Sequence, residues 1–164
     1  MTEEEFDLVH NIDARGVFLC LREELRIMRG QDPIGQGVRK SRGIIVNVSS
    51  RAGLEGVPTF GAYCAAKHAV LGLTKVAALE NADHWIRVNS ICPGLITTPG
   101  HTSDETHKEL DAKVKQKLAA ACPMQRWGEP AECTDGIMFL ASEQSSFMTG
   151  AALEIDGGMA AKSR

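Results

Sequence analysis

The stretch "AYCAAKHAV" at residues 62–70 contains the single tyrosine of the chain, Tyr63, and Lys67 follows it by four positions. Residues four apart lie on one face of a helix, so these two side chains would be neighbours. A free phenol loses its proton only near pH ~10, and a nearby ammonium group favours the phenolate. The pair could therefore exchange a proton with a substrate oxygen. The same spacing also occurs on solvated helix faces, so it is weak evidence when taken alone.

Further candidates stand where apolar, β-branched segments end. Ser50 ends "IIVNVSS", and Pro93 and Gly94 end "IRVNSICPG". A serine hydroxyl could hold a substrate oxygen and stabilise its developing charge. Serine is also common in turns, and Pro-Gly after a strand is usually only a turn. The joint occurrence of these residues, each at the matching end of its segment, favours a reactive site over separate surface features.

The hydrophobic pattern predicts the elements that must position these residues. Short apolar segments indicate buried strands, and longer segments with helical periodicity separate them. In chain order, we expect a helix over 3–28, a strand over 44–50, a helix over 62–82, a strand over 86–94, a helix over 129–143 and a strand over 151–158. This alternation predicts an α/β fold with parallel β-α-β units. Ligands of such sheets bind outside the carboxyl ends of the strands, where the candidate residues would meet.

Composition excludes several classes of protein. A net charge of -3 and a pI near 6.0 give no basic footprint for nucleic acid. No apolar run approaches the ~20 residues of a membrane-spanning helix. The five cysteines are never spaced as C-x-x-C, which suits reduced thiols in the cytoplasm better than disulfides or a zinc site. We therefore expect a cytoplasmic protein that binds no nucleic acid, no membrane and no metal.

Five segments together carry a more specific pattern. They are "HNIDARGVFLCLR", "GIIVNVSSRAG", "YCAAK", "IRVNSICPGLITTP" and "QRWGEPAECTDGIMFLASEQSSFMTGAALEIDGG". In this order they resemble the C-terminal part of the short-chain dehydrogenase/reductase family. The resemblance implies a partial Rossmann-like, doubly wound parallel sheet, made of the outer strands and helices only. It also implies an oxidoreductase that moves a hydride between NAD or NADP and a small alcohol or carbonyl substrate.

The same resemblance implies roles for individual residues. The catalytic set would be Asn11, Ser50, Tyr63 and Lys67. The family's spacing of thirteen residues before the tyrosine selects Ser50 over Ser49. Asn11 would hold a water that relays protons to Lys67, and the competing interpretation is an ordinary hydrogen bond inside a helix.

The cofactor and the subunit partner are implied in the same way. The residues expected to contact the cofactor are Tyr63, Lys67, Pro93, Gly94, Ile96 and Thr98. Thr97 is the less favoured alternative to Thr98. Helices 11–29 and 63–81 commonly form the subunit interface in this family, which implies a homo-oligomer.

The chain also departs from the family's pattern. It has no glycine-rich turn to hold the cofactor's phosphates and no residue that would choose between NAD and NADP. We therefore expect 1–164 to be a single incomplete Rossmann-type domain, to have an exposed edge strand over 43–50 and to bind neither nucleotide alone. Residues 29–42 indicate a surface-loop insertion, and residues 100–122 take the place of a substrate lid. The alternative function is a truncated pseudoenzyme or gene-model fragment that acts, if at all, as an oligomerisation partner.

Overall fold

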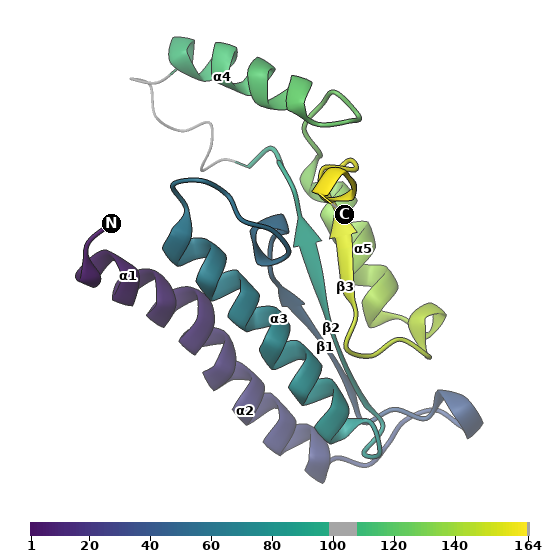
Figure 1. The fold of residues 1–164 in the computed structure, drawn as a ribbon. Helices are drawn as coiled ribbons and strands as arrows, with labels where there is room; N and C mark the ends of the chain where they lie inside the picture. The colour runs from purple at the N-terminus through teal and green to yellow at the C-terminus, as the bar shows by residue number, and fades with distance from the viewer. Residues whose placement is uncertain (99–107, 164) are drawn as a thin grey trace.

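A computed structural model describes the backbone of residues 1–98 and 108–163. The elements are α1 (Glu3–His10), η1 (Asn11–Arg15), α2 (Gly16–Gly30), β1 (Gly43–Val48), α3 (Gly61–Asn81), β2 (Ile86–Pro93), α4 (Lys108–Ala121), α5 (Pro130–Ala141) and β3 (Ala152–Ile155). This order confirms the predicted α/β fold (Figure 1). Within the described ranges, no helix combines the length and apolar character needed to cross a bilayer.

The three strands form one parallel sheet in the order β1-β2-β3. Ile45 pairs with Val88 and Ser90 pairs with Ala152, so the strands end at one common edge of the sheet. β1 is an outer strand of this sheet. It ends at Val48 and not at Ser50, because Ser50 leaves the ladder and caps the short 3-10 turn η3 (Arg51–Gly53). The expected strand was therefore two residues too long.

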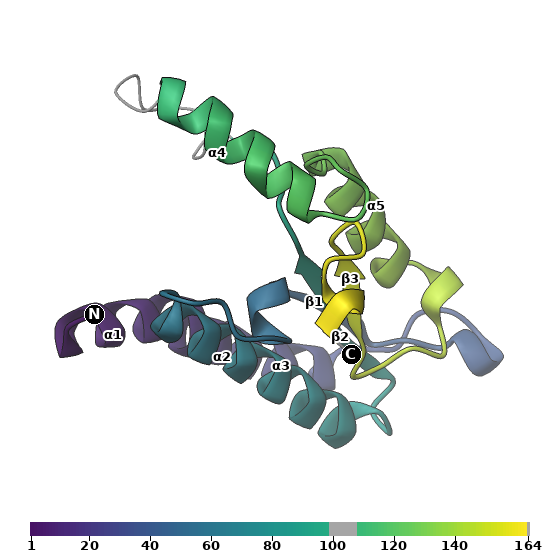
Figure 2. The same ribbon diagram turned by 45° about the horizontal axis from the view of Figure 1, so that its top comes forward.

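Helices α2 and α3 cover one face of the sheet, and α5 lies against the other (Figures 1 and 2). The core forms between α2, α3 and the sheet, where apolar side chains of the helices pack on those of β1 and β2. Its buried members are Leu21, Ile45, Ala77, Ala78, Ile86 and Val88. Alanine at buried positions of α3 lets this helix approach the sheet closely, which brings the start of α3 to the carboxyl end of β1.

The predicted helix over 3–28 is continuous in direction but is interrupted by a π-helical turn, η1, at Asn11–Arg15. The N–H of Gly16 donates to the carbonyl oxygen of Asn11, five residues earlier, instead of four. Such a turn holds one extra residue and changes which side chains face the neighbouring helix. Ala14 is buried there, whereas Asn11 stays exposed.

Two segments that the sequence set apart lie at opposite ends of the sheet. In the loop expected over 29–42, the first two residues end α2, and an antiparallel bridge between Ile34 and Ser41 closes the rest. This loop packs at the amino ends of the strands, where Lys40 lies 4.0 Å from the centre of the Trp85 ring. In the segment over 100–122, residues 100–107 lie outside the described residues, and α4 forms most of the remainder. Its role as a substrate lid stays a prediction.

Candidate active site

A cavity of about 390 Å³ opens at the carboxyl ends of β1 and β2. Its walls come from the end of β1, the first turns of α3, the chain after β2 and helix α5. The predicted residues that line it are Ser50, Tyr63, Lys67, Pro93, Gly94, Ile96 and Thr98. Most of the other lining side chains are apolar, including Ile91, Trp127 and Ile137. A few polar groups in a largely apolar cavity are typical of a small-molecule site.

The two adjacent serines have different contacts. Ser49 is 3% exposed, and its Oγ donates to the carbonyl oxygen of Lys67 at 2.9 Å, which ties the end of β1 to α3. Both serines line the cavity, but Oγ of Ser50 accepts from the N–H of Ala52 at 3.1 Å. An accepting oxygen keeps its own proton for another partner. Ser50 is therefore the serine whose hydroxyl is placed to meet a substrate.

Lys67 is 8% exposed, and polar groups from three elements surround its ammonium. The ammonium nitrogen lies 3.4 Å from the carbonyl oxygen of Val48 and 5.4 Å from the centre of the Tyr63 ring. It also lies 3.0 Å from Oδ1 of Asp13, with which it forms an ion pair. A buried charge is costly without partners, so these contacts hold the side chain in one place. Lys67 therefore cannot be a solvated surface lysine, which was the competing interpretation.

Asn11 is not among the residues that line this cavity, and its expected water relay to Lys67 stays a prediction. Its side chain is exposed, and its Oδ1 accepts from Nη1 of Arg15 at 3.4 Å. The π-helical turn is the physical reason, because it places Asp13, and not Asn11, against Lys67. Asp13 was not among the predicted site residues, because nothing in the pattern "NIDARG" predicts the π-helical turn and its extra residue. An acidic residue close to the expected Asn11 was the one available signal, since Lys67 would need a negative partner if buried.

The end of β2 approaches the turn after β3 very closely. Gly94 follows Pro93, and its N–H donates to the carbonyl oxygen of Ile155 at 3.0 Å. A Cβ on Gly94 would lie 2.8 Å from Cα of Asp156, which is closer than two carbon atoms tolerate. Gly94 therefore has a structural reason to be glycine, quite apart from any contact with a cofactor.

Beyond β2, Ile96 and Gly128 form an isolated parallel β-bridge, whose hydrogen bonds are made by the residues on either side of Ile96. The N–H of Gly128 donates to the carbonyl oxygen of Leu95, and the N–H of Thr97 donates to that of Gly128, both at 2.9 Å. In a parallel bridge of this kind, the N–H and C=O of the middle residue point the other way. Those of Ile96 are thus directed away from Gly128, and Thr98 is the threonine that lines the cavity.

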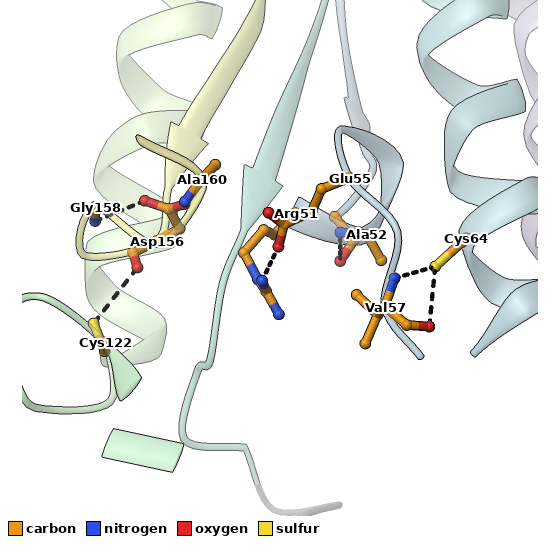
Figure 3. A network of polar contacts seen from close by, with 10 residues as sticks. Arg51, Ala52, Glu55, Val57, Cys64, Cys122, Asp156, Gly158 and Ala160 are labelled. Atoms are coloured by element: carbon orange, nitrogen blue, oxygen red, sulfur yellow. Dashed lines mark hydrogen bonds and ion pairs between the residues drawn. The ribbon is translucent and has the colours of Figure 1, made fainter. Parts of the chain in front are cut away.

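Short contacts fix the loops that flank the cavity (Figure 3). Before α3, the N–H of Val57 donates to Sγ of Cys64 at 3.4 Å. After β3, the carboxylate of Asp156 accepts from the N–H groups of Gly158 and Ala160, at 2.8 and 2.6 Å. These contacts let irregular backbone keep a defined shape beside the site.

Two cysteines beside the site, Cys133 and Cys92, are poor nucleophiles. Burial, with a smaller contribution from the Glu132 carboxylate, raises the pKa of the cavity-lining Cys133 thiol. Burial raises the pKa of Cys92 on β2 to about 11. Since the thiolate is the attacking form of cysteine, both side chains stay unreactive at neutral pH. The polar side chains that this cavity offers to a bound molecule therefore include Ser50, Tyr63 and Lys67.

Comparison with known proteins gives a consistent result. A family model described as enoyl-(acyl carrier protein) reductase matches residues 1–160. The 2-(S)-hydroxypropyl-CoM dehydrogenase 3 of Xanthobacter autotrophicus is 35% identical over 95% of this chain and 58% of its own length. The short-chain dehydrogenase srdC of Neurospora crassa is 39% identical over 94% of this chain and 57% of its own length. The chain thus spans a little under three fifths of these curated relatives.

Solved structures show the same partial match. The crystal structure of levodione reductase has a TM-score of 0.85 and 37% identity, and covers 98% of this chain and 59% of that one. The structure of ElxO with NADP bound has a TM-score of 0.81 and 36% identity, with coverage of 98% and 60%. At this identity, the similarity extends beyond the fold to the sequence.

Proposed function

Because this chain belongs to the short-chain dehydrogenase/reductase family, we propose that it carries the proton-transfer half of an NAD(P)-dependent oxidoreductase acting on an alcohol or a carbonyl compound. One observation supports this most directly: Ser50, Tyr63 and the buried Lys67 line a single cavity at the carboxyl ends of β1 and β2. The chain spans less than three fifths of its relatives, so the activity is proposed for the whole protein.

In this proposal, Tyr63 moves the proton. During oxidation, the Tyr63 phenolate takes the hydroxyl proton of the alcohol, and a carbonyl group forms as the hydride leaves the same carbon. During reduction, the Tyr63 phenol returns that proton to the substrate oxygen. Ser50 donates its hydroxyl proton to this oxygen and stabilises the negative charge that develops there. Lys67, 5.4 Å from the Tyr63 ring, favours the phenolate.

The cofactor would supply the hydride acceptor or donor, and residues after β2 would hold its nicotinamide end. The N–H and C=O of Ile96 point away from Gly128 and suit a carboxamide group. Thr98 stands beside them in the cavity wall. Lys67 would add a bond to the nicotinamide ribose. The NADP bound in ElxO supports the cofactor class, while the choice between NAD and NADP stays open.

The test of this proposal is a pH profile of alcohol oxidation. The chain is joined to the part of a relative that it does not match, and Lys67→Ala is compared with Lys75→Ala. Lys75 lies on the same helix but is exposed, so it serves as the matched control. Lys67→Ala should move the rate plateau to higher pH, because the phenolate loses its cationic neighbour, and should weaken cofactor binding. Identical profiles and affinities for the two variants would overturn the assignment of Lys67.

A second proposed property is assembly with another copy of this chain through α2 and α3. The outer surface of these helices carries exposed apolar side chains, with Phe18 45%, Ile27 55% and Val76 52% exposed. A hollow of about 420 Å³ lies between the helices and is lined by Phe18 and Val76 among others. Exposed apolar patches of this kind mark interaction surfaces. The same surface would be used whether the assembled protein is a catalytically active oligomer or the chain is only an oligomerisation partner without catalytic activity.

Sedimentation of the chain tests the assembly. Val76→Glu places a charge in this surface and should shift the protein toward monomers. Met138→Glu adds the same charge at a residue that is 62% exposed on α5, across the sheet, and should leave the mass unchanged. An equal effect of both variants, or none, would contradict the proposed interface.

We also propose a reducing compartment, the cytoplasm, for the protein. All five cysteines are free thiols in the structure, and Cys92 and Cys122 are buried. Mass spectrometry of the protein from its native cells, after blocking of free thiols, should show five blocked cysteines. A disulfide recovered from those cells would contradict this location.

A further inference from the structure

We propose that Asp13 is a positioning residue of this site, whose carboxylate offsets the charge of Lys67 and thereby weakens the stabilisation that Lys67 gives to the Tyr63 phenolate. The electrostatic effect belongs to the chain itself and can be measured without turnover. Its consequence for catalysis rests on the proposed function.

The geometry of the pair carries this inference. Oδ1 of Asp13 lies 3.0 Å from Nζ of Lys67, and the two side chains are 28% and 11% exposed. Nζ in turn lies 5.4 Å from the centre of the Tyr63 ring. Both distances are short compared with the ~10 Å over which 0.1 M salt screens charges. Tyr63 therefore faces an ion pair with no net charge, and not an isolated cation.

The backbone makes this contact specific to Asp13. The π-helical turn η1 buries Ala14 and directs the adjacent Asp13 toward α3. Asp7, one turn before η1, lies exposed on α1. A carboxylate at Asp13 is thus held in place by the fold, while one at Asp7 remains in solvent.

Other charged groups around Tyr63 and Lys67 are engaged elsewhere. On η3, Arg51 pairs with Glu55. On α1, the ring of His10 stacks on Phe6 with centroids 5.5 Å apart.

Two further groups lie on elements beside the site. On η1, Arg15 donates to Asn11. On α5, Cys133 presents a thiol whose pKa is raised by burial, so it adds no negative charge at neutral pH. Asp13 is the carboxylate that pairs with Lys67 in the described part of the chain.

Removing this carboxylate has a defined direction. A negative charge near a phenol opposes formation of the phenolate, and this holds whether Lys67 is charged or neutral. Asp13→Asn removes that charge at nearly constant size, so the phenolate should form at lower pH. Lys67→Met leaves the carboxylate without its cation, so the phenolate should form at higher pH. The two substitutions thus move one titration in opposite directions.

The chain is suited to this measurement because Tyr63 is its single tyrosine. Tyrosinate absorbance during an alkaline titration of the full chain therefore reports Tyr63 alone. Asp13→Asn should lower the midpoint by about half to one pH unit, given Coulomb energies at an effective dielectric of ~20 and partial exposure. Asp13→Glu, which keeps the charge, and Asp7→Asn, which removes a charge in solvent, should leave the midpoint in place.

Far-UV circular dichroism follows the fold during the same titration. The chain could unfold at a lower pH than the one at which Tyr63 ionises. In that case a second measurement replaces the titration, namely the rate at which Lys67 is acylated at neutral pH, followed by mass spectrometry. Only the uncharged amine reacts, so loss of the paired carboxylate in Asp13→Asn should speed its acylation several-fold relative to Asp7→Asn. The role of Asp13 would be overturned if the titration midpoint of Tyr63 in Asp13→Asn were unchanged or raised. Where acylation replaces the titration, an unchanged acylation rate of Lys67 would overturn it. Neither result depends on turnover, so failure here is distinct from failure of the proposed function.

Discussion

The two faces of the sheet differ in how completely they are covered. Helix α3, on the face with α2, has nine buried residues, among them Lys67, Val70 and Thr74. Helix α5, on the other face, has Leu140 as its buried residue, and every residue of β3 is only partly buried. Figure 2 shows the two layers on either side of the strands. The face that carries Tyr63 and Lys67 is thus covered by a buried core, whereas the α5 face is only partly buried and supplies one wall of the cavity.

The largest expected difference between the faces is in the cost of truncating an apolar side chain. Ile86 is 1% exposed within the core under α2 and α3, whereas Leu153 on β3 is half-buried beside α5. Ile86→Ala should lower the free energy of unfolding by about 3 kcal/mol, and Leu153→Ala by about 1 kcal/mol, since the cost follows the cavity left behind. Urea unfolding of both variants measures this. Equal losses would contradict the contrast between the faces.

Smaller losses, with a similar contrast between the faces, are expected when a methyl group is added to each face. A Cβ on Gly53 would lie 2.5 Å from Oγ of Ser49 and 2.7 Å from the carbonyl oxygen of Lys67, both fixed by their hydrogen bond. Gly53→Ala should therefore cost about 2 kcal/mol, as overpacking does.

The matched change on the α5 face is Gly136→Ala. Its Cβ would meet Cδ1 of Ile155, the far end of a flexible and half-buried side chain, at 2.2 Å. Ile155 can move, and alanine favours the helix over glycine by about 0.5–1 kcal/mol, so the net change should be close to zero. Thermal unfolding of both variants tests the pair. A loss for Gly136→Ala as large as that for Gly53→Ala would show that the α5 face is packed as rigidly as the other.

The smallest expected effect concerns pH and the start of α5. Hydrogen bonds from Arg126, and then from the backbone N–H of Glu129, lower the pKa of Glu132 to about 2. The folded state stabilises the ionised form of Glu132. This carboxylate therefore contributes to the free energy of unfolding at pH values above its pKa in the unfolded chain, ~4.3. This contribution is lost as pH falls through about 2.

Glu132→Gln should consequently be slightly less stable than the unsubstituted chain at neutral pH. The two proteins should be equally stable near the folded-state pKa of Glu132, about 2. The effect is small because Arg126 and Glu132 are 50% and 41% exposed, so solvent screens the pair. Denaturant midpoints of the two proteins across this pH range provide the measurement. A stability difference between the two proteins that grows as pH falls would contradict the stabilising role of the Glu132 carboxylate.

Much of the architecture could be predicted because the controlling patterns are local. The alanine-rich helical rhythm after residue 60 and the β-branched segments placed α3, β1 and β2 nearly at their observed bounds. Parallel strands end at one edge, so the meeting of Ser50, Tyr63 and Lys67 followed from their order alone. The observed cavity brings these three together.

The π-helical turn and the capping role of Ser50 could not be predicted in the same way. Periodicity favours an unbroken helix through Asn11, whereas the extra residue in η1 accompanies the burial of Ala14 where η1 meets α3, a tertiary contact that periodicity does not report. Ser50 looked like the last residue of a strand, yet its hydroxyl caps η3. The π-helical turn changes which side chain contacts Lys67, so it matters more than the ends of any helix or strand.

Steady-state turnover of Tyr63→Phe tests the central claim most directly. The chain, joined to the part of a relative that it does not match, is compared with and without this substitution, together with its affinity for NAD and NADP. The hydroxyl of Tyr63 is the proposed proton donor and acceptor, so turnover should fall by about 100-fold or more while cofactor affinity is retained. Turnover that stays within an order of magnitude of the unsubstituted protein would contradict the claim that Tyr63 performs the proton transfer.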